Sequence, residues 1–131
     1  MHALVVDDSR AMRRIVAGIL TTLHFQSAEA DNGATALAEL ERLTAADQIP
    51  ELACIDWNMP VMDGLQLVSA IRADRRWRDI TLMMVTTESE HGQIVRALAA
   101  GAHEYLIKPF TADAMADKLR YLGLVPAEVG A

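Results

Sequence analysis

The sequence predicts an α/β protein, built as a doubly wound, five-stranded parallel sheet with five helices in a three-layer sandwich. Short apolar segments of strand length alternate along the chain with segments whose apolar residues recur every three or four positions. Right-handed crossovers between parallel strands then place helices on both faces of the sheet. With 131 residues, 52% of them hydrophobic, the chain suits one domain whose core needs no disulfide or structural metal.

The first half of the chain predicts three strands and two helices. The expected strands cover residues 3–6, 25–30 and 52–55. The second strand is interrupted by Gln26 and Glu29, as is typical of an edge strand, whereas the third is apolar throughout and belongs at the sheet centre. Asp31 or Asn32 would cap the second helix. The residues expected to face inward are Met12, Ile15, Val16, Ile19, Leu20 and Leu23 in the first helix, and Ala34, Leu37, Leu40 and Leu43 in the second.

The second half predicts a loop, two strands and three helices. Residues 58–64 contain a proline and a glycine, which is typical of a loop. The expected strands cover residues 80–85 and 105–107, and the expected fourth helix covers residues 92–100. Gly101 would end that helix in a left-handed conformation, and Thr111 would cap the fifth. The helical residues expected to face inward are Leu65, Leu67, Val68 and Ile71 in the third helix, and Met115, Leu119 and Leu122 in the fifth. We expect residues 1–122 to form the domain and residues 123–131 a short tail.

Composition and charge exclude several kinds of partner. Twelve basic and eighteen acidic residues give a formal charge of -6, which repels nucleic acid and anionic lipid. The arginines around Trp77 are interpreted as a solvated helix end, where the helix dipole favours cations. The single cysteine, Cys54, excludes an internal disulfide, and no apolar run approaches the ~20 residues of a membrane span. We expect a cytoplasmic protein with no signal peptide, no membrane insertion and no direct contact with nucleic acid.

Polar residues stand where four of the predicted strands end, and the ligands of a doubly wound sheet bind beyond these carboxyl ends. They are Asp7 and Asp8 after the first strand, Asp56 after the third, Thr86 and Thr87 after the fourth, and Lys108 with Pro109 after the fifth. If the first and third strands are neighbours, three carboxylates converge, and two charges about 5 Å apart repel by ~3 kcal/mol at an effective dielectric of about 20. Such a cluster needs a cation, and a site made only of oxygen atoms favours Mg²⁺.

Each of these residues also has a plainer interpretation. The two adjacent carboxylates after the first strand could simply cap the following helix. Asp56 favours the cation site, because an acidic residue at the end of a buried apolar strand is costly unless it is paired. Lys108 would supply the positive charge, with a solvated lysine as its alternative, and a cis bond before Pro109 would turn it toward the carboxylates. Thr86 would donate its hydroxyl to a bound anion, or would be an ordinary β-branched strand residue.

Several short motifs occur together, in order, at the ends of these strands. They are VDDS at 6–9 with MRRIV at 12–16, DWNMP at 56–60 with MDG at 62–64, VTTE at 85–88, and AGA at 100–102 before YLIKPF at 105–110. In these motifs the sequence resembles the receiver domains of two-component response regulators, and in particular the stand-alone chemotaxis (CheY-like) type. The resemblance extends from about residue 4 to residue 122, nearly the whole chain.

The resemblance implies the strand order 2-1-3-4-5 and a set of roles around Asp56. Asp56 would accept a phosphoryl group from the phosphohistidine of a histidine kinase or phosphotransfer protein. Mg²⁺, or Mn²⁺ in its place, would be held by the side chains of Asp8 and Asp56 and the backbone carbonyl of Asn58, with Asp7 touching the ion or its bound water. Lys108 would neutralise the phosphoryl oxygens, so that transfer depends on positioning and charge and needs no general base.

The resemblance also implies how the signal leaves the domain. Thr86 would move toward the phosphoryl group and Tyr105 would turn inward, so that the face formed by the fourth helix, fifth strand and fifth helix changes its affinity for a downstream target protein. A phosphatase could use Asn58 and Glu88, whereas Thr87 is larger than the alanine or glycine of many receivers and would restrict access. The implied function is a phosphoacceptor in chemotaxis or a similar output, a monomer or a phosphorylation-dependent dimer, and not an enzyme.

Three alternatives accompany this interpretation. A haloacid-type aspartyl-phosphate phosphatase would carry a second aspartate two residues after the nucleophile, where this chain has Asn58. An interaction scaffold would lack a member of the site, and none is missing. A receiver domain cut from a larger response regulator or hybrid kinase would show the same motifs.

Overall fold

The computed structural model describes residues 1–87 and 91–126, and its elements follow the predicted alternation. The strands are β1 (His2–Val6), β2 (Gln26–Ala30), β3 (Leu52–Ile55), β4 (Thr81–Thr86) and β5 (Glu104–Ile107). The helices are α1 (Arg10–Thr22), α2 (Gly33–Ala45), α3 (Gly64–Ala73), the short 3-10 helix η1 (Arg75–Trp77), α4 (His91–Ala100) and α5 (Ala112–Tyr121). All strand pairs are parallel and the order is β2-β1-β3-β4-β5, so the predicted fold class is confirmed.

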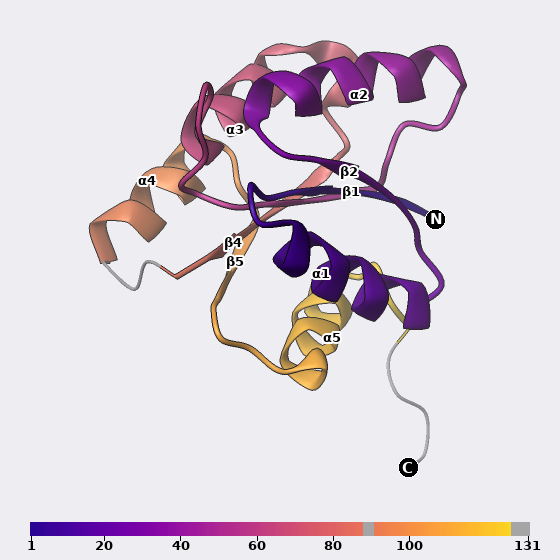
Figure 1. Ribbon diagram of the computed structural model, residues 1–131, viewed down its shortest axis with the longest axis vertical. Coiled ribbons are helices and arrows are strands. Elements are labelled where there is room, and N and C mark those ends of the chain that lie inside the picture. The colour runs from indigo at the N-terminus through magenta and orange to yellow at the C-terminus, as the bar shows by residue number, and fades with distance from the viewer. Residues whose placement is uncertain (88–90, 127–131) are drawn as a thin grey trace.

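Helices cover both faces of the sheet. In Figure 1, α1 and α5 lie on one side of the strands, and α2, α3 and α4 lie on the other. Alternate residues of β3 divide between the two cores, because successive side chains of a strand point to opposite faces. Ala53 and Ile55 pack on the α2, α3 and α4 side, and Leu52 and Cys54 on the α1 and α5 side. All four are buried, as expected of a central strand.

Side-chain caps fix where four of the helices begin. Ser9 caps α1 by accepting a hydrogen bond from the amide of Met12, so neither of the two preceding aspartates is the cap. The Asn32 side chain caps α2 by accepting a hydrogen bond from the amide of Thr35. The Thr35 hydroxyl accepts from the amide of Asn32 in return, which completes a capping box. Asp63 caps α3 in a capping box with Gln66, and the Thr111 hydroxyl caps α5 by accepting from the amide of Ala114. Each such cap contributes about 1 kcal/mol to helix stability.

Two residues predicted to face inward are exposed instead. Ile15 of α1 is 53% exposed, and Ala34 of α2 is also on the surface. The buried stripe of α1 centres on Val16 and Leu20, and Ile15 lies just beyond its edge. In α2 the stripe begins at Gly33, one residue earlier than predicted. Periodicity predicts that each helix has a buried apolar stripe, but the elements packed against the helix decide how wide the stripe is and at which residue it begins.

The arginine-rich segment after α3 is more buried than predicted. Trp77 of η1 is 3% exposed and donates its indole N–H to the hydroxyl of Thr44 at 2.9 Å. Arg72 donates to the backbone oxygens of Gly101 at 2.9 Å and Ile80 at 2.7 Å. The prediction of a solvated helix end was therefore wrong for these two residues, although Arg75 and Arg78 are exposed. The segment joins α3 to the start of β4 and the end of α4.

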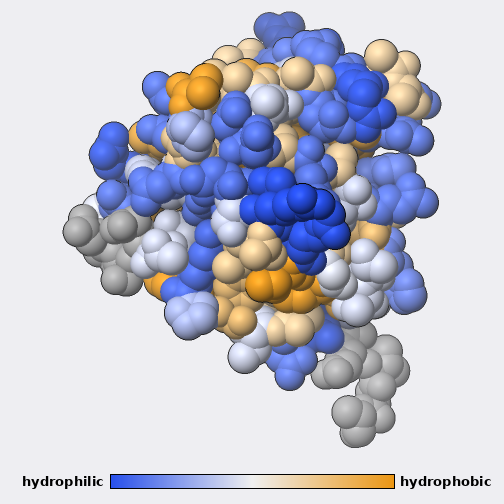
Figure 2. Space-filling view, viewed as in Figure 1, coloured by the Kyte–Doolittle hydropathy of each residue, from blue (hydrophilic) through white to orange (hydrophobic). Residues whose placement is uncertain are grey.

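Figure 2 views the molecule from the same side as Figure 1, with both helix layers visible. Hydrophilic residues cover much of this face, and smaller hydrophobic areas lie among them. Among the described residues, no helix combines the length and the apolar character that a membrane crossing requires.

The turn between β3 and α3 is closed by a glycine in close contact with backbone atoms. The amide of Gly64 donates to the carbonyl of Trp57 at 2.9 Å. A Cβ atom at this position would overlap the backbone oxygen of Asp56 and lie 3.0 Å from the Cα of Trp57. Because both neighbours are backbone, they cannot move aside as a flexible side chain could. The turn therefore has room for glycine at this position but not for a residue with a Cβ atom.

We expect Gly64→Ala to lower the free energy of unfolding by about 1–3 kcal/mol, because the added methyl group overpacks the turn. Urea denaturation measures this change. Gly18→Ala is the matched control, since a Cβ there meets nothing within 4 Å in the middle of α1. It should stabilise the protein by about 0.5–1 kcal/mol through helix propensity. Equal effects of the two substitutions would contradict the close contact at Gly64.

Candidate functional site

Strand pairing brings the predicted carboxylates together at one edge of the sheet. β1 pairs with β3 so that Val6 lies opposite Ile55, and Asp7 and Asp56 therefore follow neighbouring strand ends. The amide of Asp56 donates to the carbonyl of Val6 at 2.8 Å, which continues the ladder to the site. Carboxylate oxygens of Asp7, Asp8 and Asp56 all lie within 4.8 Å of one another. Asp7 and Asp56 are buried, and Asp8 is exposed.

Lys108 reaches this cluster from the end of β5. Its Nζ atom donates to Oδ2 of Asp7 at 2.8 Å and to Oδ1 of Asp56 at 3.3 Å. The side chains of Lys108, Asp7 and Asp56 are only 11%, 5% and 10% exposed. Water screens such a cluster poorly, so the ammonium is the main compensation for the buried carboxylates among the described residues.

The pKa of Asp56 is raised to about 6, above the ordinary aspartate value. Burial is the largest cause, because it disfavours the charged form, and the negative charge of Asp7 acts in the same direction. The charge and hydrogen bond of Lys108 lower the pKa, but not enough to offset burial. Asp56 is thus a carboxylate whose charge is costly in the metal-free protein.

The other predicted site residues lie around this cluster in different ways. Thr86 is buried at the end of β4, and its carbonyl accepts a hydrogen bond from the amide of Lys108 at 2.8 Å. The bond between Lys108 and Pro109 is cis. Asn58 and Thr87 are exposed. Glu88, the residue proposed for a phosphatase, lies outside the described residues.

Thr86 and Tyr105 share one face of the sheet. Thr86 lies opposite Ile107, and Tyr105 lies opposite Met84, two residues before Thr86. Because side chains alternate, Thr86, Met84 and Tyr105 all belong to the α3 and α4 side. The Tyr105 ring is half-buried, and the Nζ atom of Lys118 lies 4.7 Å from its centroid.

Two residues outside the predicted site, Ser9 and Arg13, support it. The amide of Ser9 donates to Oδ1 of Asp7 at 2.8 Å, and the guanidinium of Arg13 donates to the backbone oxygen of Asp7 at 2.7 Å. One signal for Arg13 was available, because a cation near the start of a helix opposes the helix dipole. Its contact with Asp7, six residues earlier, depends on the path of the turn.

The cluster suits a hard divalent cation. Its donor atoms are all carboxylate oxygens, which Mg²⁺ and Mn²⁺ prefer over softer ions. Asp8 is on the surface, so the cluster opens to solvent on that side. An ion there would offset the repulsion that Lys108 alone does not neutralise.

Fold and site together define a small doubly wound domain with a carboxylate and lysine centre at the carboxyl edge of its sheet. The chain belongs to the family of response regulator receiver domains, whose sequence model matches residues 3–120. It is similar to chemotaxis protein CheY1 of Helicobacter pylori, with 41% identity over 120 residues that cover 91% of this chain and 94% of that one. It is 42% identical to chemotaxis protein CheY of Pseudomonas aeruginosa over 120 residues, or 91% and 93% of the two chains. The solved structure of chemotaxis response regulator CheY4 of Vibrio cholerae matches with a TM-score of 0.81 at 30% identity, covering 92% of this chain and 97% of that one.

The raised pKa of Asp56 predicts a pH-dependent effect of Asp56→Asn on stability in metal-free buffer. The folded protein binds the Asp56 proton more tightly than the unfolded chain does, so the wild type loses stability as the pH rises from about 4 to about 6. Moving the pKa from 3.8 to about 6 corresponds to at most about 3 kcal/mol. Asparagine stays neutral, so the stability gained by Asp56→Asn should grow across this window and then level off.

Urea unfolding of both proteins in the presence of a chelator, from about pH 4 to about pH 8, measures this difference. Asp117→Asn, at a carboxylate that is 74% exposed on α5, is the control and should show no such growth. A gain that stays constant with pH, or that grows toward acid, would contradict the cause assigned to the pKa.

Proposed function

We propose that Asp56 is the phosphoacceptor of a two-component signalling module. A carboxylate oxygen of Asp56 attacks the phosphorus of a phosphohistidine on a histidine kinase or phosphotransfer protein. The new O–P bond replaces the P–N bond, and the imidazole leaves. The observation that carries this proposal is the contact of Lys108 with Asp56 inside a cluster of three carboxylates.

The contacts of the neighbouring aspartates support Asp56 as the acceptor. Both oxygens of Asp7 already accept hydrogen bonds, Oδ1 from the amide of Ser9 and Oδ2 from Lys108. Asp8 is exposed, so water would compete with the protein for contacts to a phosphoryl group placed there. Asp56 follows the central strand β3 and makes the longer contact with Lys108. Of the three carboxylates, that of Asp56 is therefore the best placed to form a covalent bond to phosphorus.

The chain's own residues position the reaction and balance its charge. Lys108 would turn its ammonium to the phosphoryl oxygens as negative charge is added at Asp56. The side chains of Asp8 and Asp56, the backbone carbonyl of Asn58 and the nearby Asp7 would hold Mg²⁺, or Mn²⁺ in its place. The ion would supply charge neutralisation for the phosphoryl oxygens. The domain would thus assist its own phosphorylation and dephosphorylation without turning over a separate substrate as an enzyme does.

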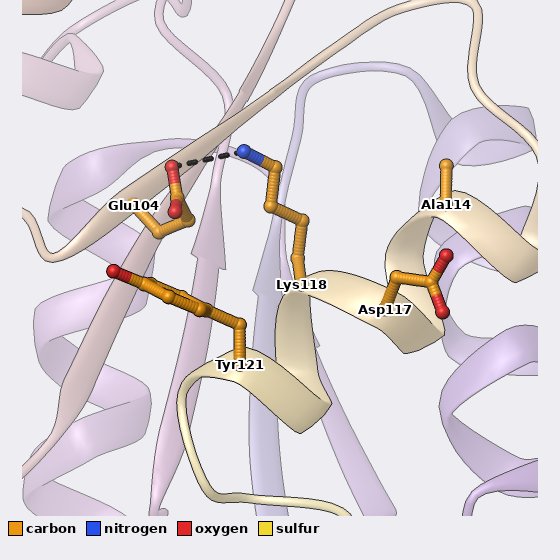
Figure 3. Close-up of a pocket in the computed structure, with 5 residues that line it drawn as sticks. All are labelled: Glu104, Ala114, Asp117, Lys118 and Tyr121. Carbon is orange, nitrogen blue, oxygen red and sulfur yellow. Dashed lines mark ion pairs between the residues drawn. The ribbon is translucent and has the colours of Figure 1, made fainter. Parts of the chain in front are cut away.

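The output surface in this proposal is the face of α4, β5 and α5. Val95 and Leu98 of α4 are 49% and 41% exposed, and Tyr121 of α5 is 81% exposed. Figure 3 shows the pocket between β5 and α5, where Lys118 extends from α5 to pair with Glu104 at 3.1 Å. Exposed apolar and aromatic side chains beside charged ones suit a protein partner.

Phosphorylation would reach this face through Thr86 and Tyr105, which share one side of the sheet. Thr86 would move toward the phosphoryl group, and Tyr105 would turn into the space beside it. The similar proteins named above are chemotaxis proteins, which supports chemotaxis or a similar output for this chain. Its downstream partner would bind the face of α4, β5 and α5.

Incubation with Mg²⁺ and acetyl phosphate should add one phosphoryl group to the wild-type protein and none to Asp56→Asn. The reason is that the amide of asparagine is not a nucleophile toward phosphorus. Intact mass spectrometry measures the addition, and Asp117→Asn is the control that should be labelled like the wild type. A label that persists in Asp56→Asn would overturn the assignment of the acceptor.

Mg²⁺ should stabilise the folded protein, because the carboxylates form a binding site only when the chain is folded. At a concentration of about 100 times the dissociation constant, the gain is about 2.7 kcal/mol. Mn²⁺ should act in the same way, and Asp8→Asn should reduce the gain. Thermal unfolding with and without each ion measures it. An equal gain in the wild type and in Asp8→Asn would contradict a site that includes Asp8.

A further inference from the structure

Arg13 occupies a position that its helix does not favour. It is the fourth residue of α1, at the end of the first turn, near the positive pole of the helix dipole. Its side chain is nevertheless only 15% exposed, whereas the neighbouring Arg14 lies on the surface. A cation that is partly buried at the positive end of a helix needs specific partners to offset that cost.

Two acceptors hold the guanidinium of Arg13. Its Nη1 atom donates to the backbone oxygen of Asp7 at 2.7 Å, and its Nε atom donates to Oε1 of Glu29 at 3.1 Å. Glu29 belongs to the edge strand β2 and is not part of the carboxylate cluster. Arg13 therefore ties the turn between β1 and α1 to the neighbouring strand. In Figure 1 the chain passes through this turn directly from the end of β1 into α1.

The hydrogen bond from Arg13 to the carbonyl oxygen of Asp7 restrains the peptide unit between Asp7 and Asp8. The other polar groups of Asp7 are also held: its amide donates to the carbonyl of Ala30 at 3.1 Å, and its carboxylate accepts from Ser9 and Lys108. The carbonyl oxygen is the remaining polar group, and it lies in the same rigid plane as the amide of Asp8. Rotation of this plane would move the Cα of Asp8 and swing its exposed carboxylate away from the cluster.

We propose that Arg13 is a positioning residue of the phosphorylation site. By fixing the peptide plane between Asp7 and Asp8, it keeps the Asp8 carboxylate within reach of the ion that Asp8 and Asp56 share. Glu29 holds Arg13 in place. This inference rests on the proposed function, because it assigns Arg13 to the divalent cation site of that proposal.

The sign of the effect on Mg²⁺ binding separates positioning from simple electrostatics. Removing a positive charge near a cation site should strengthen Mg²⁺ binding if only long-range charge matters. Removing a positioning contact should weaken it, because the ligands are no longer held in place. Loss of such supporting contacts typically costs about 10-fold to 100-fold in metal affinity.

The test is the Mg²⁺ dissociation constant, measured by isothermal titration calorimetry well below the unfolding temperature. Arg13→Met should raise the dissociation constant about 10-fold. Arg14→Met, which removes the same charge from the adjacent exposed position, should leave it unchanged or lower it. Glu29→Ala should also weaken binding, but it removes a negative charge as well, so Arg13→Met is the variant that separates positioning from electrostatics. Arg13→Lys should weaken binding less, since an ammonium can reach the Asp7 oxygen without the planar fork.

Phosphorylation by acetyl phosphate supplies a second measurement. Arg13→Met should be phosphorylated slowly at low Mg²⁺ and at nearly the wild-type rate once Mg²⁺ saturates the site. Tighter Mg²⁺ binding by Arg13→Met, or equal weakening in Arg13→Met and Arg14→Met, would overturn the positioning role. Failure of the wild-type protein itself to become phosphorylated would instead overturn the proposed function, so the two failures are distinguishable.

Discussion

The contact of one buried ammonium with two buried carboxylates is the interaction on which the site depends. Lys108 bridges Asp7 and Asp56, while Asp8 adds a third negative group at the surface. One ammonium cannot neutralise three carboxylates. Burial is the largest cause of the raised pKa of Asp56, and the negative charge of Asp7 raises it further. The remaining negative charge favours binding of a divalent cation. The cation in turn lets Asp56 meet an incoming phosphoryl group, whose own charge Lys108 is placed to receive.

The order and parallel direction of the strands bring Asp7, Asp56 and Lys108 together. Since β1 and β3 are neighbours and every strand is parallel, Asp7 and Asp56 emerge at the same edge of the sheet. β5 lies two strands away from β3, and the lysine side chain spans that separation. Close packing of Gly64 against the backbone of Asp56 holds the turn after β3. Backbone pairing between the strands thus positions the strand ends, and the side chains there form the site.

The members of the site could be predicted from the sequence because each follows an apolar strand segment directly, and parallel strands share their carboxyl edge. The helix positions followed from the alternation of segments, whereas the strand order was implied by the resemblance to receiver domains. Contacts that depend on helix phase could not be predicted. Ile15 is exposed because the stripe of α1 is narrow. Trp77 packs in the core, where Thr44 of α2 accepts its N–H. The bond from Arg13 to Asp7 belongs to this second group, since it needs the exact path of a turn. Periodicity describes one element at a time, whereas these contacts join two.

The most direct test of the central claim is to locate the divalent ion by anomalous scattering in crystals grown with Mn²⁺. We expect one strong anomalous peak in contact with the carboxylate oxygens of Asp8 and Asp56, with Lys108 still beside Asp56. A peak at another part of the molecule, or Asp7, Asp8 and Asp56 turned away from one another, would contradict it.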